Sequence, residues 1–207
     1  MYTVYGDLRS GNCYKVRLLM DLLDLPHRWR HIDIFRGESR RPEFLAMNPN
    51  GRIPVLKMPD GNCLCESNAI LFYLGEGSRW IPSDRLERAR MLQWMFFEQY
   101  SHEPYIATSR YWITLLGEAE RFAREISERR NGGEAALKVM EEHLQKQDFF
   151  LAQGPSLADI ALFAYTHVAD EGGFSLSPFP AIRHWIARME ALPGFRAMEQ
   201  IIAQDAE

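Results

Sequence analysis

The first 80 residues alternate between strand-like and helical spacing of their apolar positions. Residues 2–5 and 29–34 have strand character, and 12–24 carries apolar side chains at i, i+3, i+4 and i+7, as in a helix with one buried face. Those four positions are Val16, Leu19, Met20 and Leu23. Pro26 marks the end of the helix. A strand, a helix and a second strand in this order predict a parallel pair with a right-handed crossover.

A hairpin and a closing helix follow. Residues 55–58 and 62–65 have strand character on either side of a Pro-Asp-Gly turn at 59–61, and Asp-Gly between two apolar runs indicates a hairpin. Residues 42–47 predict a short helical turn, and 67–76 predicts a helix after the hairpin. The order βαβαββα is that of an α/β thioredoxin-like domain, which is the fold we expect here.

Beyond Trp80 the strand signal disappears and helical spacing dominates. Residues 81–86 predict a linker in which Ser83 or Asp84 caps the next helix. We therefore expect a thioredoxin-like domain at 1–80 and an all-α helical domain at 87–207. The expected helices cover 85–116, 118–130, 134–151, 156–171, 179–191 and 194–203, with turns at Asn131–Gly133 and Gly172–Gly173.

Ser156 and Asp159 have the spacing of a capping box. In such a box the serine side chain accepts a hydrogen bond from the backbone near the helix start, and the acidic side chain reaches back to the serine amide. We interpret this pair as structural, because it satisfies the end of the predicted helix at 156–171.

Composition limits the function classes that need consideration. The chain has 207 residues, of which 46% are hydrophobic and 25% charged, and its net charge is −4. This acidic balance does not favour binding to nucleic acid or to an anionic membrane surface. No apolar run approaches the ~20 residues that span a bilayer, and the N-terminal residues lack a secretory pattern. We therefore expect a cytoplasmic protein.

The three cysteines, Cys13, Cys63 and Cys65, are too few for a disulfide framework and fit a reducing compartment. Cys63 and Cys65 are two residues apart, would face the same side of a strand, and do not suit a bridge. We interpret them as small buried residues. No group of cysteines and histidines has the spacing of a zinc site, so we expect neither a metal nor a cofactor.

The segment from Asn48 to Leu56, NPNGRIPVL, is the most informative stretch of the chain. Pro54 is at the expected first residue of a strand. Proline is tolerated at that position although it has no N–H to donate to a sheet. A cis bond before Pro54, which X–Pro bonds reach readily, would leave the backbone of Ile53 free to pair with an extended peptide. Glu66 and Ser67 then fall at a strand-to-helix junction, which suits a carboxylate. Together these features predict a small acidic peptide as ligand.

This segment, followed by E-S-x-A-I at 66–70, resembles the motifs of the glutathione transferase family, and the resemblance extends along the whole chain. It implies glutathione as co-substrate and a homodimer. It also implies the binding roles. By this resemblance Glu66 and Ser67 hold the γ-glutamyl group, Ile53 beside Pro54 pairs with the cysteinyl backbone, and Arg40 (or Arg41) and Arg52 bind the glycyl carboxylate.

The loop before the first helix carries the candidates for activating the glutathione thiol. A thiol with a pKa of about 8.5 is only about 3% ionised at pH 7, and lowering that pKa by ~2 units requires ~2.7 kcal/mol. A helix N-terminus typically supplies ~0.3–1 kcal/mol, and hydrogen bonds to the anion supply ~1.5–3 kcal/mol each. Ser10 and Asn12 offer an O–H and an N–H₂ donor at this place.

Other interpretations of this loop stay open. Cys13 could form mixed disulfides, as in the cysteine-type members of the family, and Ser10 and Asn12 could be no more than helix caps. Tyr5 is expected to lie inside the first strand. The serine and asparagine spacing also resembles bacterial members that reduce disulfides with glutathione.

An aromatic stretch in the helical domain suggests where a second substrate binds. We expect Tyr105, Tyr111 and Trp112 to line an apolar pocket between the domains. The predicted function is conjugation of the glutathione thiolate to small apolar electrophiles. Glutathione-dependent disulfide reduction at the same site, isomerisation, and non-catalytic glutathione binding are the alternatives.

Overall fold

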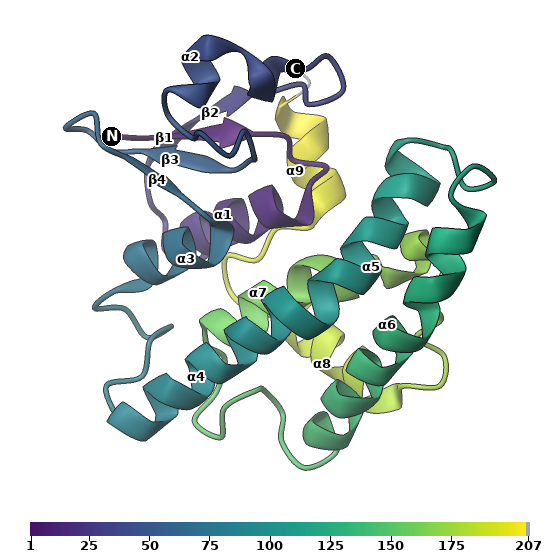
Figure 1. Cartoon of the computed structure of the whole chain (residues 1–207). Helices are drawn as coiled ribbons and strands as arrows, with labels where there is room; N and C mark the ends of the chain where they lie inside the picture. Colours follow the sequence, from purple (N-terminus) through teal and green to yellow (C-terminus); the bar gives the residue numbers. More distant parts are fainter. Residues whose placement is uncertain (206–207) are drawn as a thin grey trace. The chain divides into compact units, whose positions relative to one another are not determined.

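The computed structural model describes residues 1–205, which form two compact units (Figure 1). One unit contains Met1–Gly77 together with the C-terminal segment that begins at Leu192, and the other contains Ser78–Ala191. This C-terminal segment, predicted to be part of the helical domain, groups by its contacts with the unit that holds the sheet. Within the described residues, no helix has both the length and the apolar character needed to cross a bilayer.

The first unit is built on a four-stranded mixed sheet. Its strands are β1 (Tyr2–Gly6), β2 (His27–His31), β3 (Val55–Lys57) and β4 (Cys63–Cys65), in the order β2-β1-β3-β4. β1 pairs with β2 in parallel and with β3 antiparallel, and β3 and β4 form the expected hairpin. This arrangement confirms the α/β thioredoxin-like fold.

The second strand lies earlier in the chain than predicted. β2 ends at His31, so Ile32 and Ile34 are outside the sheet. The cause is a turn around Asp33, whose Oδ1 accepts hydrogen bonds from the amides of Phe35 and Arg36 at 2.9 and 3.1 Å. An aspartate that binds the backbone two residues onward favours a turn over an extended strand.

Helices surround this sheet. They are α1 (Gly11–Leu22), α2 (Pro42–Leu45), α3 (Ser67–Gly75) and α9 (Met198–Asp205). α1 packs against α3, and its apolar side chains, such as Leu18 and Leu19, are fully buried. The Tyr14 hydroxyl donates to the Arg196 carbonyl at 2.8 Å, which ties the C-terminal segment to α1.

The second unit is all helical, as expected. α4 (Arg85–Phe97) and α5 (Glu103–Arg110) are joined by a π-helical turn at Glu98–His102, and a second π-helical turn at Tyr111–Leu115 follows α5. The helix predicted at 85–116 is therefore helical without a break to Leu115, with two π-helical turns within it. Asp84 caps α4, and its side chain accepts hydrogen bonds from the amides of Leu86 and Glu87. A cap at Asp84 was one of the two predicted alternatives.

The turn predicted at Asn131–Gly133 is wrong, because α6 runs unbroken from Ala123 to Leu144. The two glycines serve close packing instead. A Cβ atom on Gly132 would lie 2.3 Å from the Tyr105 ring, and one on Gly133 would lie 2.3 Å from the Phe174 ring. Real Cβ atoms essentially never come that close, so only glycine fits under these aromatic rings. The two consecutive glycines, which usually mark a turn, therefore do not interrupt α6.

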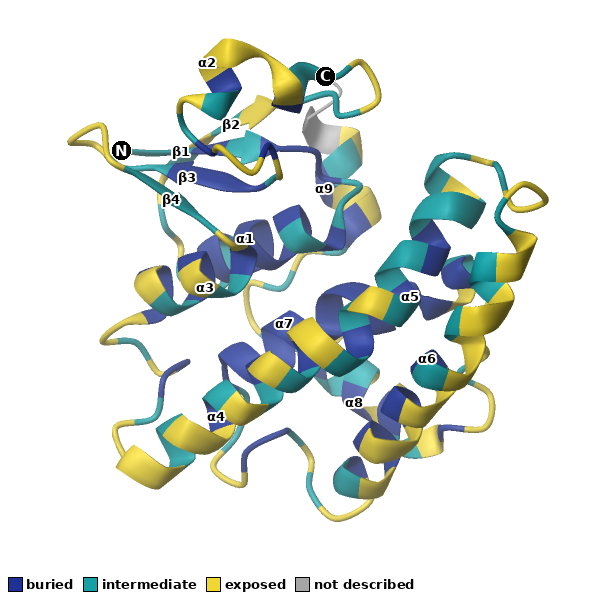
Figure 2. Cartoon of the chain, in the orientation of Figure 1, coloured by how far each residue is buried: buried dark blue, intermediate teal, exposed yellow. Residues whose placement is uncertain are grey.

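The remaining helices are α7 (Leu157–Thr166) and α8 (Pro180–Glu190), with a short 3₁₀ turn at Ala169–Gly172. Figure 2 shows α7 buried along its whole length. The capping box before α7 is confirmed. Asp159 also accepts hydrogen bonds from the amide of Phe150 and the indole of Trp185, so it binds three separate parts of the unit.

Candidate functional site

The loop before β3 has the predicted geometry. The Ile53–Pro54 peptide bond is cis, Pro54 is buried and Ile53 is half-buried. Asn48, to which the sequence analysis gave no role, shapes this loop. Its buried side chain donates from Nδ2 to the Arg52 carbonyl at 2.7 Å and accepts at Oδ1 from the Asn50 amide at 3.1 Å. Its place at the head of the NPNG motif was the available signal.

The basic candidates lie on or beside this loop. Arg40 donates from Nη1 to the Asn50 carbonyl at 3.0 Å, and its guanidinium covers Gly51, where an added Cβ would be 2.5 Å from it. Arg40 thus supports the loop while it stays exposed. Arg52 is exposed on the loop itself. Arg41, the fallback, forms an ion pair with Glu38 at 3.3 Å.

Glu66 and Ser67 stand at the start of α3, as predicted. Glu66 is exposed and has a positive φ of 66°, a left-handed conformation that non-glycine residues seldom adopt. Ser67 is buried, and its hydroxyl lies 2.9 Å from Oδ1 of Asn12. The structure therefore brings together two candidates that are 55 residues apart in the sequence.

The geometry at the start of α1 bears on whether Ser10 and Asn12 activate a thiol or only cap the helix. Ser10 has the extended backbone of an N-cap residue but makes no side-chain capping bond. The helix-cap interpretation therefore lacks its defining hydrogen bond for Ser10. Both Ser10 and Asn12 are half-buried. Next to them, Lys15 is fully buried and lies with Nζ 2.8 Å from Oδ1 of Asn12. Lys15 is a residue that the sequence analysis did not consider for the site.

The environment of Cys13 does not suit a nucleophile. Its side chain is fully buried. Burial raises the pKa of this thiol to about 12, although hydrogen bonds from the Asp7 backbone and the Ser10 side chain oppose the rise. A thiol with that pKa is protonated at neutral pH, and the thiolate is the reactive form.

The three aromatic candidates lie in the helical unit. Tyr105 packs over Gly132. Trp112 stacks on Phe122 with ring centroids 4.8 Å apart and also contacts the Arg129 guanidinium at 4.6 Å. Tyr111 is half-buried. Tyr105 and Trp112 therefore pack within their own unit, and the role of all three toward a second substrate stays a prediction.

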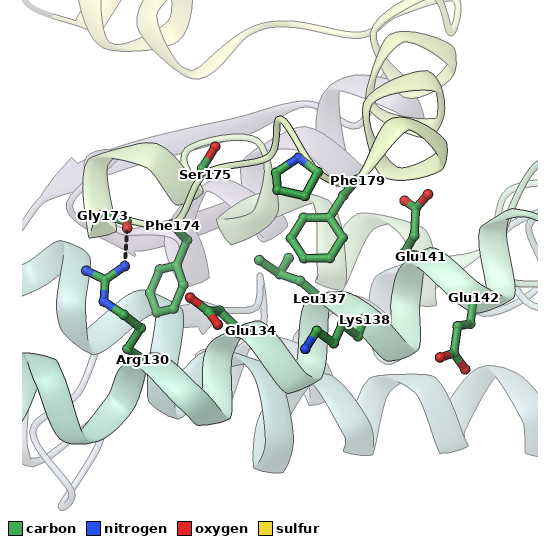
Figure 3. A pocket seen from close by; sticks show the side chains of 11 residues that line it. Arg130, Glu134, Leu137, Lys138, Glu141, Glu142, Gly173, Phe174, Ser175 and Phe179 are labelled. Carbon is green, nitrogen blue, oxygen red and sulfur yellow. Dashed lines mark hydrogen bonds between the residues drawn. The ribbon is translucent and has the colours of Figure 1, made fainter.

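A cavity of about 530 Å³ opens on the helical unit, between α6 and the segment that leads into α8. Figure 3 shows the apolar side chains of Leu137, Phe174 and Phe179 among charged groups of α6. Nearby, Glu141 caps α8 by accepting from the amides of Ala181 and Ile182. None of the residues that line this cavity is a candidate from the sequence.

The part of the chain that the structure describes holds no group of three or more histidine, cysteine, aspartate or glutamate side chains placed to bind a metal. The candidate site is instead a set of hydrogen-bonding groups at the starts of α1 and α3 and on the cis-proline loop. Such a set can hold an extended peptide and offer donors to an anion.

Comparison with known proteins fits this arrangement. Residues 9–76 match the model of the glutathione S-transferase N-terminal domain, and residues 93–193 match that of the C-terminal domain. The chain belongs to the glutathione S-transferase family. The two matches together span most of the sequence, and the glutathione S-transferase fold seen in the structure agrees with them.

Individual glutathione S-transferases are similar over nearly the full length. The crystal structure of one from Pseudomonas fluorescens Pf-5 has 50% identity and a TM-score of 0.93, covering 95% of this chain and 98% of that one. URE2P6 of Phanerochaete chrysosporium, solved with oxidized glutathione, has 26% identity and a TM-score of 0.87, covering 98% and 96%. The disulfide-bond oxidoreductase YfcG of Escherichia coli is 26% identical, covering 89% of this chain and 88% of the relative.

Proposed function

We propose that this protein is a glutathione transferase that activates the glutathione thiolate for conjugation to small apolar electrophiles. The observation that carries the proposal is the hydrogen bond between Ser67 and Asn12 at 2.9 Å. It joins the α3 start, which would bind one end of glutathione, to the α1 start, which would receive the sulfur. The solved relative that contains oxidized glutathione supports the ligand.

Glutathione would lie extended along the cis-proline loop. The backbone of Ile53 would pair with the cysteinyl residue, and the exposed Arg40 and Arg52 would receive the glycyl carboxylate. The γ-glutamyl group would meet Glu66 and the start of α3. Because the Ser67 hydroxyl is bonded to Asn12, the group that Ser67 offers to a carboxylate is its backbone N–H at the helix N-terminus.

The sulfur would then lie over the start of α1. The helix N-terminus favours an anion by ~0.3–1 kcal/mol, and a hydrogen bond to a charged group adds ~1.5–3 kcal/mol. With one donor from Asn12, these contributions cover the ~2.7 kcal/mol that a two-unit fall in the thiol pKa requires. The Ser10 hydroxyl, which donates to the Cys13 thiol, would add a second donor by turning toward the sulfur. The thiolate attacks the electrophile, its sulfur–carbon bond forms, and the leaving group departs with the displaced electron pair.

Disulfide reduction at the same site is the second candidate, and the similarity to an Escherichia coli disulfide-bond oxidoreductase favours it. The glutathione thiolate attacks one sulfur of the substrate disulfide and releases the other sulfur as a thiolate, which takes up a proton. A second glutathione then attacks the mixed disulfide. Two glutathione molecules are oxidised to glutathione disulfide, and one substrate disulfide is reduced to two thiols.

The test is a titration of the ultraviolet thiolate absorbance of glutathione bound to the purified protein. We expect a thiol pKa well below that of free glutathione. An unshifted pKa with tight binding would favour a non-catalytic glutathione-binding module. Turnover with an aryl halide and with a mixed disulfide of glutathione then separates conjugation from disulfide reduction.

The proposed protein is a homodimer and lies in the cytoplasm. The support is the family and two exposed aromatic side chains, Phe96 of α4 and Tyr100 of the π-helical turn that follows it, which are 70% and 82% exposed. Exposed aromatic groups of this size favour a protein contact. Sedimentation equilibrium of the wild type and of Phe96→Glu is the check, and a monomeric wild type would overturn this part.

A further inference from the structure

We propose that Cys63 and Cys65 bind one soft monovalent metal ion of the copper(I) class between their sulfur atoms. This inference goes beyond the proposed function and does not rest on it. Both cysteines are free and lie on β4, an edge strand of the sheet. Predicted to be small buried residues, they are instead half-buried, as the intermediate colour of β4 in Figure 2 shows. Their thiols are therefore within reach of an ion from solvent.

Both side chains project from the same face of β4. Successive side chains of a strand point to opposite faces, so positions 63 and 65 share a face and Leu64 points the other way. Cys63 Sγ lies 3.8 Å from the Gly61 carbonyl oxygen, and Cys65 Sγ lies 3.6 Å from the Met47 carbonyl oxygen. Thiols are weak donors, and contacts of this length give way readily to a metal–sulfur bond.

The spacing of two positions on one face of a strand is too wide for a disulfide but suits a bridging ion. At a rise of about 3.3 Å per residue, the Cα atoms are about 6.6 Å apart, and parallel Cα–Cβ bonds keep the Cβ atoms at a similar distance. A disulfide needs Cβ atoms about 3.8 Å apart. Two metal–sulfur bonds of about 2.3 Å in a straight line place the sulfurs about 4.6 Å apart. Each sulfur reaches that position by leaning inward by about 1 Å.

A pair of thiolates also selects the kind of ion. Thiolates are soft ligands and favour copper(I) over hard cations. Structural zinc takes four ligands, and residues 1–205 hold no group of three or more cysteine, histidine, aspartate or glutamate side chains placed for it. Monovalent ions with a filled d shell are stable with two ligands in line. The pair therefore fits a copper(I)-type ion and does not fit zinc.

The charges around the two thiols agree with this choice. Burial raises the pKa of the Cys65 thiol, and the nearby Cys63 and Glu66 add to the rise. Two thiols that affect each other in this way repel once ionised, and a cation between them removes the repulsion. Two thiolates on a monovalent ion keep one net negative charge. Lys57 lies directly opposite Cys63 in the hairpin, on the same face, where its ammonium group offsets that charge.

The binding step involves no change of oxidation state. The ion forms one bond to each sulfur, each S–H bond breaks, and both protons pass to solvent. The site therefore needs no oxidant or reductant beyond an ion that is already monovalent.

The experiment titrates the reduced protein with copper(I) under anaerobic conditions, in competition with a coloured copper(I) chelator. The variants are Cys63→Ser, Cys65→Ser and a swap that combines Leu64→Cys with Cys65→Leu. The swap is the matched control, because it keeps all three cysteines but places the two thiols of β4 on opposite faces. Cys13→Ala tests whether the fully buried third thiol takes part. Circular dichroism establishes that each variant is folded.

We expect the wild type to bind one copper(I) per chain, with sulfur as the only neighbouring element in X-ray absorption. Each serine variant and the swap should bind about 10²- to 10⁴-fold more weakly, because the second thiolate no longer acts within the same site. Cys13→Ala should bind as the wild type does. Wild-type affinity in the swap or in either serine variant would overturn the inference, and so would loss of binding in folded Cys13→Ala.

Alkylation of the wild type decides if one of these variants does not fold. Bound copper(I) should protect both Cys63 and Cys65 from iodoacetamide, as read by mass spectrometry of the peptides. Alkylation of either cysteine at the same rate with and without copper(I) would overturn the inference.

Discussion

Two serines precede helices in this protein, and their surroundings differ. Ser156 accepts a hydrogen bond from the Ala158 amide and shares a capping box with the fully buried Asp159. Asp159 also accepts from Phe150 and Trp185 of the helical unit. Ser10 occupies the same N-cap position before α1 but makes no side-chain capping bond. Its neighbour Asn12 binds α3 and Lys15 instead. The first arrangement satisfies the end of its own helix, whereas we propose that the second holds side chains for a ligand.

The difference shows that the role of a polar residue before a helix follows from the partners of its hydrogen bonds. A cap that satisfies its own helix contributes to stability and has no capacity left for a ligand. A helix start whose serine makes no capping bond, and whose next polar side chain is held by another helix, is a candidate for binding a ligand. The predictions that follow test this division in order of expected effect.

Removing the buried cap should have the largest effect on stability. Asp159→Ala leaves the amides of Phe150 and Ser156 and the Trp185 indole without this acceptor. At ~1–3 kcal/mol for each buried unsatisfied group, the free energy of unfolding should fall by about 4 kcal/mol or more. Urea denaturation measures it. The control is Asp84→Ala, an exposed cap of α4, which should cost about 1 kcal/mol. Equal losses would remove the distinction between buried and exposed caps.

The same carboxyl should make stability depend on pH. Burial raises the pKa of Asp159 to about 6 from its ordinary 3.8. The folded state therefore binds this proton more tightly than the unfolded state, so the contribution to stability is full below pH ~3.8 and is lost as the pH rises through ~6. We expect Asp159→Ala to cost about 2 kcal/mol more at pH 4.5 than at pH 7. A cost that is larger at pH 7 would contradict the raised pKa.

Asn12→Ala should affect chemistry more than binding. Losing one hydrogen bond to the thiolate costs ~1.5–3 kcal/mol, so we expect kcat for an aryl halide to fall about 10- to 100-fold. The Kd for S-methylglutathione should change less than threefold. Equal losses in kcat and affinity would mean that Asn12 serves binding in general instead of the sulfur anion.

Replacing Ser10 and Ser156 by alanine should have different effects on stability and on catalysis. Ser156→Ala should lower the free energy of unfolding by about 1 kcal/mol and leave the bound thiol pKa unchanged. Ser10→Ala should cost little stability, since no capping bond is lost, and should reduce kcat several-fold more than it reduces affinity. Loss of stability in Ser10→Ala of the same size as in Ser156→Ala would restore the helix-cap interpretation.

Much of the fold could be predicted from local patterns. The proline in NPNGRIPVL, the Asp-Gly turn and the Ser156 capping box each act through neighbours in the chain, and each is found in the structure. The Gly132–Gly133 pair was misread because its meaning comes from the rings of Tyr105 and Phe174, which are far away in sequence. Local spacing cannot report an approach of that kind.

Some features of the candidate site could likewise be predicted from local sequence, and others could not. The cis-proline loop and the α3 start could be predicted because their backbone geometry follows from residue type. The burial of Lys15 beside Asn12 could not, since a lysine on a helix is usually an exposed surface charge. The local motifs predicted a small acidic peptide as ligand, and the resemblance to a known family narrowed this prediction to glutathione.

The bond from Tyr14 to the Arg196 carbonyl has a consequence for how the chain can be divided. The unit that holds the sheet is discontinuous, since the chain leaves it at Gly77 and returns at Leu192. The helical unit is thus an insertion within the first unit's chain. A fragment that ends in the linker would lack α9 and would leave the Tyr14 hydroxyl without its carbonyl partner. Joining 1–77 to the segment that begins at Leu192 would keep this hydrogen bond, and truncation at the linker would lose it.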